Sequence, residues 1–366
     1  MEEESVRFTV SKNVFYNPAM RFCRSMSSLV VGAIGDAEGK LDVVDAFCAS
    51  GIRGIRYAKE NKNVGRVIFI DLERSAINLA KKNARVNKIK NGALEGNISR
   101  LAFQCEGDFV EIDPFGTPSP YLVDALRLFN RKKTAYLSVT ATDVAVLCGG
   151  KVAACLKNYH ARPLNNDFTH ENGLRILLGR MVEMAAEFNF GTEPLVSFSD
   201  RHYLKVIVRL RRGADLAYGC QKKQGYITWC SACGYRFPGQ FPATGACGFC
   251  GANKNEFAGP LWLGELHDAD FLKKMAALNG QRKYSDKEDI ARMLSVMEGE
   301  IGMPPYYYNV HELCSIHHIQ PVPKFSDFMG ALEAKGHAAR RTHFSPVSIK
   351  TAAPYREVLE ALGWKG

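Results

Sequence analysis

The chain has 366 residues, of which 46% are hydrophobic and 23% are charged, a composition typical of a globular protein long enough for two domains. This composition excludes a disordered chain, and no run approaches the ~20 apolar residues of a membrane span. Lys and Arg outnumber Asp and Glu by 48 to 38, and the net charge of +10 suits an anionic partner such as nucleic acid, although many basic proteins bind none.

The first residues and the cysteines indicate the compartment. The chain begins "MEEESVRFTV", which is acidic where a secretory signal has a basic and then an apolar stretch. We therefore expect a cytoplasmic protein. Its 11 cysteines are then expected to be reduced thiols, some of which hold metal.

An α/β pattern starts at Leu41. "LDVVDAF" predicts a short strand, "CASGIRGIRYAKE" a glycine turn that opens a helix, and "RVIFIDL" a second strand. In "ERSAINLAKKNARVN", Ile77, Ala80 and Ala84 fall on one face of a helix. This β-α-β order predicts a parallel sheet.

Further strands are expected at 109–113, in "TAYLSVT" from Thr134, and in "PLVSFSD" and "YLKVIVRL", which a short link joins as a hairpin. Before that hairpin, "HENGLRILLGRMVEMAAEF" has a helical period. Its apolar side chains predict a buried helix face, made of Leu174, Leu177, Leu178, Met181 and Phe188.

The composition changes near Gly213. Residues 225–259 are rich in Gly, Cys and aromatic residues, and a helical pattern returns after about Gly264. We therefore predict three parts: an α/β domain at 1–212, a cysteine-rich module packed on it at 213–264, and a smaller α+β, mainly helical C-terminal domain at 265–366.

The cysteine-rich part contains two C-x-x-C pairs, Cys230 with Cys233 and Cys247 with Cys250. A glycine follows each pair and allows a tight turn that aims both thiolates at one ion. Four thiolates suit tetrahedral zinc, and because they leave no open position, the zinc is expected to be structural. The alternative is four unrelated or disulfide-bonded cysteines.

The glycine turn "DAFCASGIRG" contains only part of the dinucleotide-binding pattern G-x-G-x-x-G. Gly51 and Gly54 would let the backbone approach a ligand closely, and Asp71, 20 residues after Gly51, is placed to bind ribose hydroxyls. A nicotinamide-dependent enzyme, a methyltransferase and a purely structural turn all fit this pattern.

The stretch "FVEIDPFGTP" ends a predicted strand on Asp113, Pro114 and Phe115. Ligands of open parallel sheets lie beyond the carboxyl ends of the strands. There a carboxylate can accept a hydrogen bond from an amino group while the ring stacks on its base. The pattern favours methyl transfer to an amine. The alternatives are an Asp that caps the next helix and a Phe in the core.

The Asp-Pro-Phe stretch resembles the D/N-P-P-Y/F signature of amino-methylating, S-adenosylmethionine-dependent enzymes. Its DPFG form is similar to that of the tRNA (guanine-26, N(2)) dimethyltransferase family. Further matching stretches follow in the family's order: "VFYNPAMRFCRSMS", "ASGIRGIRYAKE", "CGGKVAACLKNYHARP", "HENGLRILLGR", the four cysteines, "PPYYYNVHELC" and "RTHFSPVSIKTAAP". "DPFGTP" and "IKTAAP" depart from the usual DPFGSP and IKTDAP, and the second departure weakens any role assigned to that C-terminal loop.

The resemblance implies a Rossmann-like class I methyltransferase domain, a zinc-binding module and a C-terminal domain that helps to hold tRNA. By matching position, Arg24 would pair with the carboxylate of the S-adenosylmethionine cofactor. Arg53 would line the same pocket and Asp71 would hold the ribose. Asn97 and Ile98 would contact the adenine, although "EGNISRL" departs from the usual acidic motif.

For the substrate, the resemblance implies that Phe15 and Phe115 sandwich the target guanine. The residues implied in catalysis are Asp113, Pro114 and Phe115, with Asp113 as acceptor for the guanine amino group. The expected products are N(2)-methyl- and N(2)-dimethylguanosine at position 26 of tRNA. For Phe15, a place in the core remains the alternative.

Two other functions remain open. One is a DNA or protein amino-methyltransferase with the same motif, and the other is a basic zinc protein that binds tRNA without turnover. The C-terminal cations Lys335, Arg340, Arg341 and Lys350 favour RNA, and we expect them to contact phosphates. Nothing in the sequence implies a protein partner.

Overall fold

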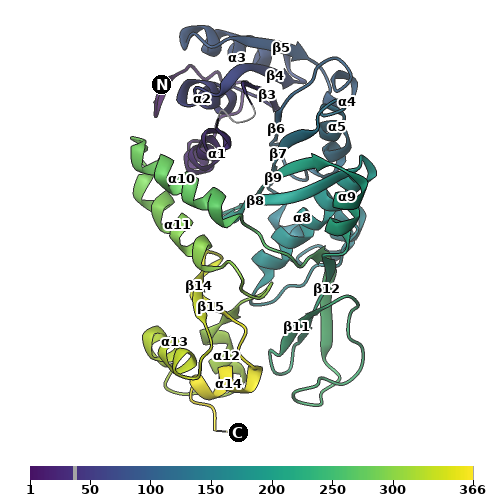
Figure 1. The fold of residues 1–366 in the computed structure, drawn as a ribbon, viewed down its shortest axis with the longest axis vertical. Helices are drawn as coiled ribbons and strands as arrows, with labels where there is room; N and C mark the ends of the chain where they lie inside the picture. The colour runs from purple at the N-terminus through teal and green to yellow at the C-terminus, as the bar shows by residue number, and fades with distance from the viewer. Residues whose placement is uncertain (36–38, 366) are drawn as a thin grey trace.

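The computed structural model describes residues 1–35 and 39–365, and in this part of the chain seven strands form one central sheet. The strands lie in the order β5-β4-β3-β6-β7-β9-β8. Their bounds are β3 Leu41–Ala46, β4 Val64–Asp71, β5 Asn91–Glu95, β6 Phe109–Ile112, β7 Thr134–Ala141, β8 Phe190–Asp200 and β9 Tyr203–Arg212. β3 to β7 are parallel, whereas β9 is antiparallel to both β7 and β8. The predicted α/β fold with a largely parallel sheet is confirmed (Figure 1).

Each strand expected in this sheet is present, and the hairpin of β8 and β9 is confirmed. β6 ends at Ile112, so Asp113 lies immediately beyond its carboxyl end. β5 was not predicted from the sequence. It is a short edge strand, "NGALE", whose side chains are mostly half-buried and do not alternate clearly between apolar and polar.

One face of the sheet is covered by α1 (Arg21–Ile34), α2 (Ile52–Glu60) and α3 (Arg74–Val86). α10 (Ala269–Gln281) packs against α1, and α11 (Lys287–Gly299) packs against α10. Both helices contribute side chains to the same core as the sheet. The first two helices of the predicted C-terminal domain therefore complete the core of the α/β domain, and the boundary at 265 stays a prediction.

The other face is covered by α8 and by shorter helices. These are η2 Ser119–Tyr121, α4 Ile98–Leu101, α5 Leu122–Arg127, α6 Val144–Leu147, α7 Val152–Tyr159 and α8 Thr169–Glu187. The predicted buried face of α8 is confirmed for Leu174, Leu177, Leu178 and Met181, while Phe188 is half-buried just after the helix end. In the described part of the chain, no helix combines the length and apolar character needed to cross a membrane.

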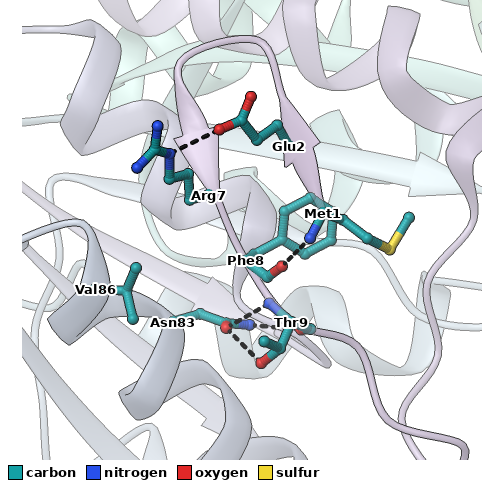
Figure 2. A pocket seen from close by; sticks show the side chains of 7 residues that line it. All are labelled: Met1, Glu2, Arg7, Phe8, Thr9, Asn83 and Val86. Atoms are coloured by element: carbon teal, nitrogen blue, oxygen red, sulfur yellow. Dashed lines mark hydrogen bonds and ion pairs between the residues drawn. The ribbon is translucent and has the colours of Figure 1, made fainter.

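The N-terminal segment forms a small hairpin of β1 (Glu2–Glu3) and β2 (Val6–Arg7), which is followed by η1 (Pro18–Met20). Figure 2 shows how its end is held on α3: the Asn83 side chain accepts hydrogen bonds from the backbone N–H of Thr9, at 2.9 Å, and from the Thr9 hydroxyl, at 3.1 Å. Asn83 also donates to the carbonyl of Ser50, at 2.9 Å. These bonds fix the hairpin beside the glycine turn that follows β3.

The cysteine-rich part follows α9 (Ala214–Gln221) and contains the antiparallel sheet β11-β10-β12. Its strands are β10 Gln224–Cys230, β11 Arg236–Gly239 and β12 Asn255–Trp262. β12 lies against α8, and Ala258, Leu261 and Trp262 join the core on that side of the central sheet.

The end of the chain has its own small core, built by Val310, Leu313, Phe328, Leu332 and Ile349 among others. It contains a sheet with the order β13-β15-β14. Its elements are β13 Tyr308–Asn309, α12 Val310–Ile316, α13 Phe325–Ala334, β14 Ala339–Thr342, β15 Ser345–Thr351 and α14 Tyr355–Ala361. In Figure 1 this small α+β unit lies at the opposite end of the molecule from β5 and α3.

Candidate active site and metal centre

A cavity of about 550 Å³ opens at the carboxyl ends of β3, β4 and β6. Its lining contains every predicted substrate and catalytic residue and three of the five predicted cofactor residues: Phe15, Arg24, Arg53, Asp71, Asp113, Pro114 and Phe115. These residues come from separate parts of the chain, and the parallel sheet brings them to one edge.

The glycine turn after β3 forms one wall of the cavity. Phe47, Ala49 and Gly51 have φ values of 65°, 47° and 76°, in the left-handed region that side chains usually disfavour. A Cβ on Gly51 would lie 2.9 Å from the Ala80 Cβ, so only glycine fits there. The turn is fixed from β4, because Asp71 Oδ2 accepts the backbone N–H of Ala49 at 2.9 Å.

Asp71 lies at the end of β4, as predicted. Its Oδ1 accepts the backbone N–H of Glu73 at 3.0 Å. Each carboxylate oxygen therefore holds one backbone N–H and retains a further lone pair toward the cavity, which suits a ribose hydroxyl.

Asn97 and Ile98 do not line the main cavity. They line a neighbouring recess of about 80 Å³, whose wall shares Phe47, Asp71 and Leu72 with the main cavity. The Asn97 side chain accepts the backbone N–H of Ser99 at 2.9 Å and caps α4. The structure thus places both residues beside Asp71, and their contact with the adenine stays a prediction.

Arg24 is buried in the cavity wall and is already paired. Its Nε donates to Glu3 Oε1 at 2.7 Å, its Nη2 donates to Glu3 Oε2, and both terminal nitrogens lie 3.2 Å from the carbonyl oxygen of Asn17. Glu3 also accepts from Arg56, at 3.0 Å, and from the Tyr16 hydroxyl, at 2.9 Å. Sequence reasoning missed Glu3, because an acid in "MEEES" resembles a solvated charge.

Arg53 reaches the end of β6. Its Nη2 donates to Asp113 Oδ2, and its Nε lies 3.8 Å from Glu111 Oε1. Burial raises the pKa of the Asp113 carboxyl, but the charges of Arg53 and Lys205 and the hydrogen bond from Arg53 lower it more, so the pKa lies below its ordinary value. Asp113 is therefore ionised at neutral pH.

The turn after Asp113 is rigid at both ends. Pro114 restricts the backbone, and Gly116, with a φ of 80°, donates its N–H to Thr142 Oγ1 at 2.8 Å. The next helical turn, η2, has Pro118 at its N-cap, so Asp113 is not a helix cap. Phe115 is 77% exposed and Phe15 is 53% exposed, so neither ring is a core residue.

The two rings meet at the cavity. Their centroids lie 4.6 Å apart with an interplanar angle of 79°, an edge-to-face contact. A base can enter between them only if the rings separate. The predicted sandwich around guanine therefore requires a movement of Phe15 or Phe115 and stays a prediction.

The four predicted zinc ligands converge. Their Sγ atoms lie within 4.8 Å of one another, with 3.8 Å between Cys230 and Cys250 and 3.7 Å between Cys233 and Cys247. Tetrahedral Zn–S bonds of about 2.3 Å place sulfurs about 3.8 Å apart. Gly234 and Gly251 both have positive φ, as the predicted turns require. The donor set fits one four-coordinate zinc ion.

This chain is similar to known proteins over almost its whole length. The family model described as N2,N2-dimethylguanosine tRNA methyltransferase matches residues 1–363. This chain belongs to that family. The tRNA (guanine(26)-N(2))-dimethyltransferase of Methanobrevibacter smithii is 34% identical over 95% of this chain and 91% of its own length. That of Archaeoglobus fulgidus is 34% identical over 99% and 98%.

A solved structure also matches this chain over nearly its whole length. Trm1 from Pyrococcus horikoshii, in complex with S-adenosyl-L-methionine, aligns with a TM-score of 0.88 and 29% identity over 99% of both chains. The match confirms the Rossmann-like methyltransferase fold expected from the sequence, with its additional C-terminal unit.

One expectation for this family member is wrong. Lys350, predicted to contact phosphate, is only 2% exposed, because it lies in β15 and donates to Glu171 of α8 and to the carbonyl of Pro304, at 3.0 Å. Lys335 is exposed and lies 2.6 Å from Glu360 Oε2, and Arg340 and Arg341 are exposed as well. These three remain the candidates for phosphate contacts.

A second group with possible metal ligands is formed by His267, Glu300 and His343. His267 Nδ1 accepts the backbone N–H of Ser197 at 3.4 Å, so its proton lies on Nε2, which lies 3.6 Å from Glu300 Oε2. Glu300 Oε1 also accepts the backbone N–H of His343 at 2.6 Å, and it lies 2.9 Å from the Nδ1 atom of the His343 ring. Hydrogen bonds to Glu300 and from Ser197 hold the group where β8, the end of α11 and the β14–β15 turn meet, while the buried Nε2 atoms of His267 and His343 have no hydrogen-bond partner among the described residues.

Sequence reasoning also missed part of the cavity rim. Arg201, His202 and Tyr203, in and beside the β8–β9 turn, line the cavity. The hairpin was predicted, but its position next to β7 places this turn at the same sheet edge as Asp113. The position of this turn at the cavity rim follows from the strand order across the sheet, which a single sequence does not reveal.

Proposed function

We propose that this chain transfers one or two methyl groups from S-adenosyl-L-methionine to the exocyclic amino group of guanosine 26 of tRNA. The observation that carries the proposal is the single cavity in which the Asp113-Pro114-Phe115 turn faces Asp71 and the glycine turn. Membership of the dimethyltransferase family supplies the substrate class.

The cofactor would be held by Asp71 at its ribose, by Arg24 and Arg53 in the pocket, and by Asn97 and Ile98 at its adenine. When bound, it supplies a methyl group on a positively charged sulfur. The remaining N–H of Arg24 Nη1 is the atom left for the cofactor carboxylate, since Glu3 and Asn17 occupy its other donors.

Asp113 would accept a hydrogen bond from the guanine amino group. That nitrogen is a poor nucleophile, because its lone pair is delocalised into the ring, so orientation is a large part of the catalysis. With its pKa held low, Asp113 is a weak base and acts mainly as an acceptor while the nitrogen attacks. The methylated nitrogen would then be cationic and strongly acidic, and it would pass its proton to the Asp113 carboxylate or to water. Phe115 and Phe15 would stack on the base, offsetting the few kcal/mol that flipping a paired nucleotide costs.

The cysteine module is proposed to hold one structural zinc ion through Cys230, Cys233, Cys247 and Cys250. The closed thiolate shell leaves no position for substrate. Residues 265–366 are proposed to add tRNA affinity, and the three-domain division at 212 and 264 is kept as part of this proposal.

The decisive experiment is a nucleoside analysis. Unmodified tRNA transcripts with guanosine or adenosine at position 26 are incubated with the protein and S-adenosyl-L-methionine, digested and measured by mass spectrometry. N(2)-methyl- and N(2)-dimethylguanosine should form only with guanosine 26. Stoichiometric cofactor binding without any methylated nucleoside, or equal methylation of both transcripts, would contradict the proposal.

A further inference from the structure

A buried chain of polar side chains leads from the cavity into the sheet. Lys205 and Glu111 are both 0% exposed, and Lys205 Nζ donates to Glu111 Oε1 at 2.5 Å and to Thr140 Oγ1 at 2.9 Å. The Tyr57 hydroxyl donates to Glu111 Oε2 at 2.8 Å. Glu111 therefore accepts on both oxygens, deep below the cavity.

Strand geometry explains this arrangement. Glu111 lies two residues before Asp113, so both side chains leave the chain on the same face of the sheet. β7 lies between β6 and β9, and Thr140 of β7 is the direct partner of Lys205 in β9. Arg53 and Tyr57 lie one turn apart on α2 and both face Glu111.

Arg53 joins this chain to the cavity. It lies between Glu111, 3.8 Å from its Nε, and Asp113, to which its Nη2 donates. Its Nη1 has only weaker partners, Ser27 Oγ at 3.4 Å and Cys23 Sγ at 3.7 Å. The position of the guanidinium therefore depends on the two carboxylates.

Stability alone does not account for the buried pair. Removing two charges from water costs about as much as their attraction returns, and an apolar pair of similar volume is often at least as stable. The pair does, however, place a fixed negative charge beside Arg53 and a fixed positive charge near Asp113.

We propose that Lys205 and Glu111 are positioning residues for methyl transfer: their pair fixes Arg53, and Arg53 fixes the Asp113 carboxylate toward the guanine amino group. This inference rests on the proposed function of Asp113. Neither residue is among those that line the cavity. Glu111 acts through Arg53, and Lys205 acts through Glu111 and through its own charge near Asp113.

The charges around Asp113 support the inference. Arg53 of α2 and Lys205 of β9 lower its pKa against the effect of burial. Asp45 of β3 also faces this region, and burial raises its pKa to about 7, with a further rise from Glu111 and Asp113 against the lowering by Arg53 and by the Gly54 N–H.

The test is the double variant Lys205→Met/Glu111→Gln, which removes both charges and leaves neither partner unpaired. We expect the single-turnover rate at saturating tRNA and cofactor to fall by roughly 10- to 100-fold, the scale of a small misplacement of a reacting group. The dissociation constant of tRNA should stay within about threefold, because the exposed C-terminal cations are unchanged. The cofactor is saturating in this assay, so a change in its affinity through Arg53 does not enter the rate.

The pH dependence separates positioning from a general loss of structure. Without Lys205, the pKa of Asp113 rises, so the rate should begin to fall at a higher pH than in the native protein. Loss of Glu111 lowers the pKa of Asp45 and would move any limb due to Asp45 the opposite way. The direction of the shift therefore identifies the group.

The matched control is Lys350→Met/Glu171→Gln, which removes another buried Lys–Glu pair whose residues do not line the cavity. Arg175, which also pairs with Glu171, keeps its hydrogen bonds to the carbonyls of Trp262 and Gly264. The thermal stability of this control is expected to fall by a similar amount, with the native rate and pH profile at saturating tRNA.

If the Lys205→Met/Glu111→Gln protein is unfolded, Tyr57→Phe is measured instead. It removes one hydrogen bond to Glu111 and should lower the rate at saturating tRNA at least threefold, with a native pH profile because Lys205 and Arg53 are kept.

Two outcomes are distinct. A native rate and pH profile in the Lys205→Met/Glu111→Gln protein, or a native rate in Tyr57→Phe where the double variant is unfolded, together with an impaired Asp113→Ala protein, overturns the positioning inference alone. A native rate in Asp113→Ala removes the proposed role of Asp113 and the inference with it.

Discussion

Asp113 is a carboxylate with a side chain that is 23% exposed and faces buried cations. Because Arg53 and Lys205 keep its pKa low, the Asp113 carboxylate is charged in the folded protein at neutral pH. A strongly ionised acceptor beside an amino group orients the nitrogen lone pair without removing a proton first. The environment thus suits methylation of a weakly nucleophilic amine better than general base catalysis.

Asp113→Ala should lower the single-turnover rate by roughly 10²- to 10⁴-fold, the range for a positioned catalytic group. Asp113→Asn keeps one acceptor oxygen and should lose less. Binding of tRNA should change little, since the exposed C-terminal cations are untouched. Rapid-quench methylation with saturating tRNA measures the rate, and a rate within a few-fold of native would refute the catalytic role.

Phe115→Ala is the companion experiment at the same scale. Loss of one stacking ring should weaken productive binding of the flipped base by about 1–3 kcal/mol, while cofactor affinity stays near native. The measurement is the apparent affinity for tRNA in single-turnover assays, beside calorimetric cofactor binding. A variant with lowered cofactor affinity instead would assign Phe115 to the cofactor pocket.

The residues found from the sequence are those that sit in local motifs. Asp113, Phe115, Asp71 and the glycine turn each lie next to a strand end, so a short stretch predicts their place. Glu3, Glu111 and Lys205 have no such signal, because Glu3 pairs 21 residues away with Arg24, and Lys205 pairs 94 residues away with Glu111. Their contacts depend on the tertiary fold, which cannot be read from a single sequence.

Among the elements, the cysteine module was the most predictable, because ligand spacing and two glycines define its geometry. β5 was not predicted because apolar and polar side chains do not alternate clearly along it. The helices α10 and α11 were assigned to the C-terminal domain because periodicity predicts a helix but not the element against which it packs. In the structure the two helices place Leu272, Met275 and Leu294 in the core of the central sheet, and the domain boundary at 265 stays a prediction. A contact over such sequence distance follows from the tertiary fold alone.

Cys230→Ser should lower zinc content below one ion per chain and reduce the thermal midpoint, because the metal site exists only in the folded chain and the free energy of zinc binding therefore adds to the stability of the fold. Activity should fall indirectly: the carbonyl of Cys233 accepts from the Tyr355 hydroxyl, and Phe249 packs on the Tyr355 ring at 4.8 Å. Elemental analysis and thermal denaturation measure both effects. Cys105→Ser, outside the cluster, is the control, and native protein free of zinc would contradict the prediction.

Over the whole molecule, the charge excess of +10 is not available in full to a ligand. Buried arginines and lysines, including Arg24, Arg56, Lys205 and Lys350, are neutralised by Glu3, Glu60, Glu111 and Glu171. Phosphate binding therefore depends on exposed cations. At the C-terminal end, Arg340 and Arg341 project from β14, where Arg341 lies 4.7 Å from the Phe325 ring centroid.

Neutralising these two arginines should change the salt dependence of tRNA binding. Each phosphate contact releases counterions, so Arg340→Gln/Arg341→Gln should reduce the slope of log K against log salt by roughly 1 to 2. Arg340 also lies 3.1 Å from Glu333, but this exposed pair is weak and yields readily to a phosphate. The slope is measured by filter binding between low and physiological salt.

The control variant is Lys82→Gln/Arg85→Gln on α3, at the opposite end of the molecule (Figure 1). It removes the same charge and should leave the slope nearly native. Equal slopes in native protein and the β14 variant would show that tRNA does not reach this end of the molecule.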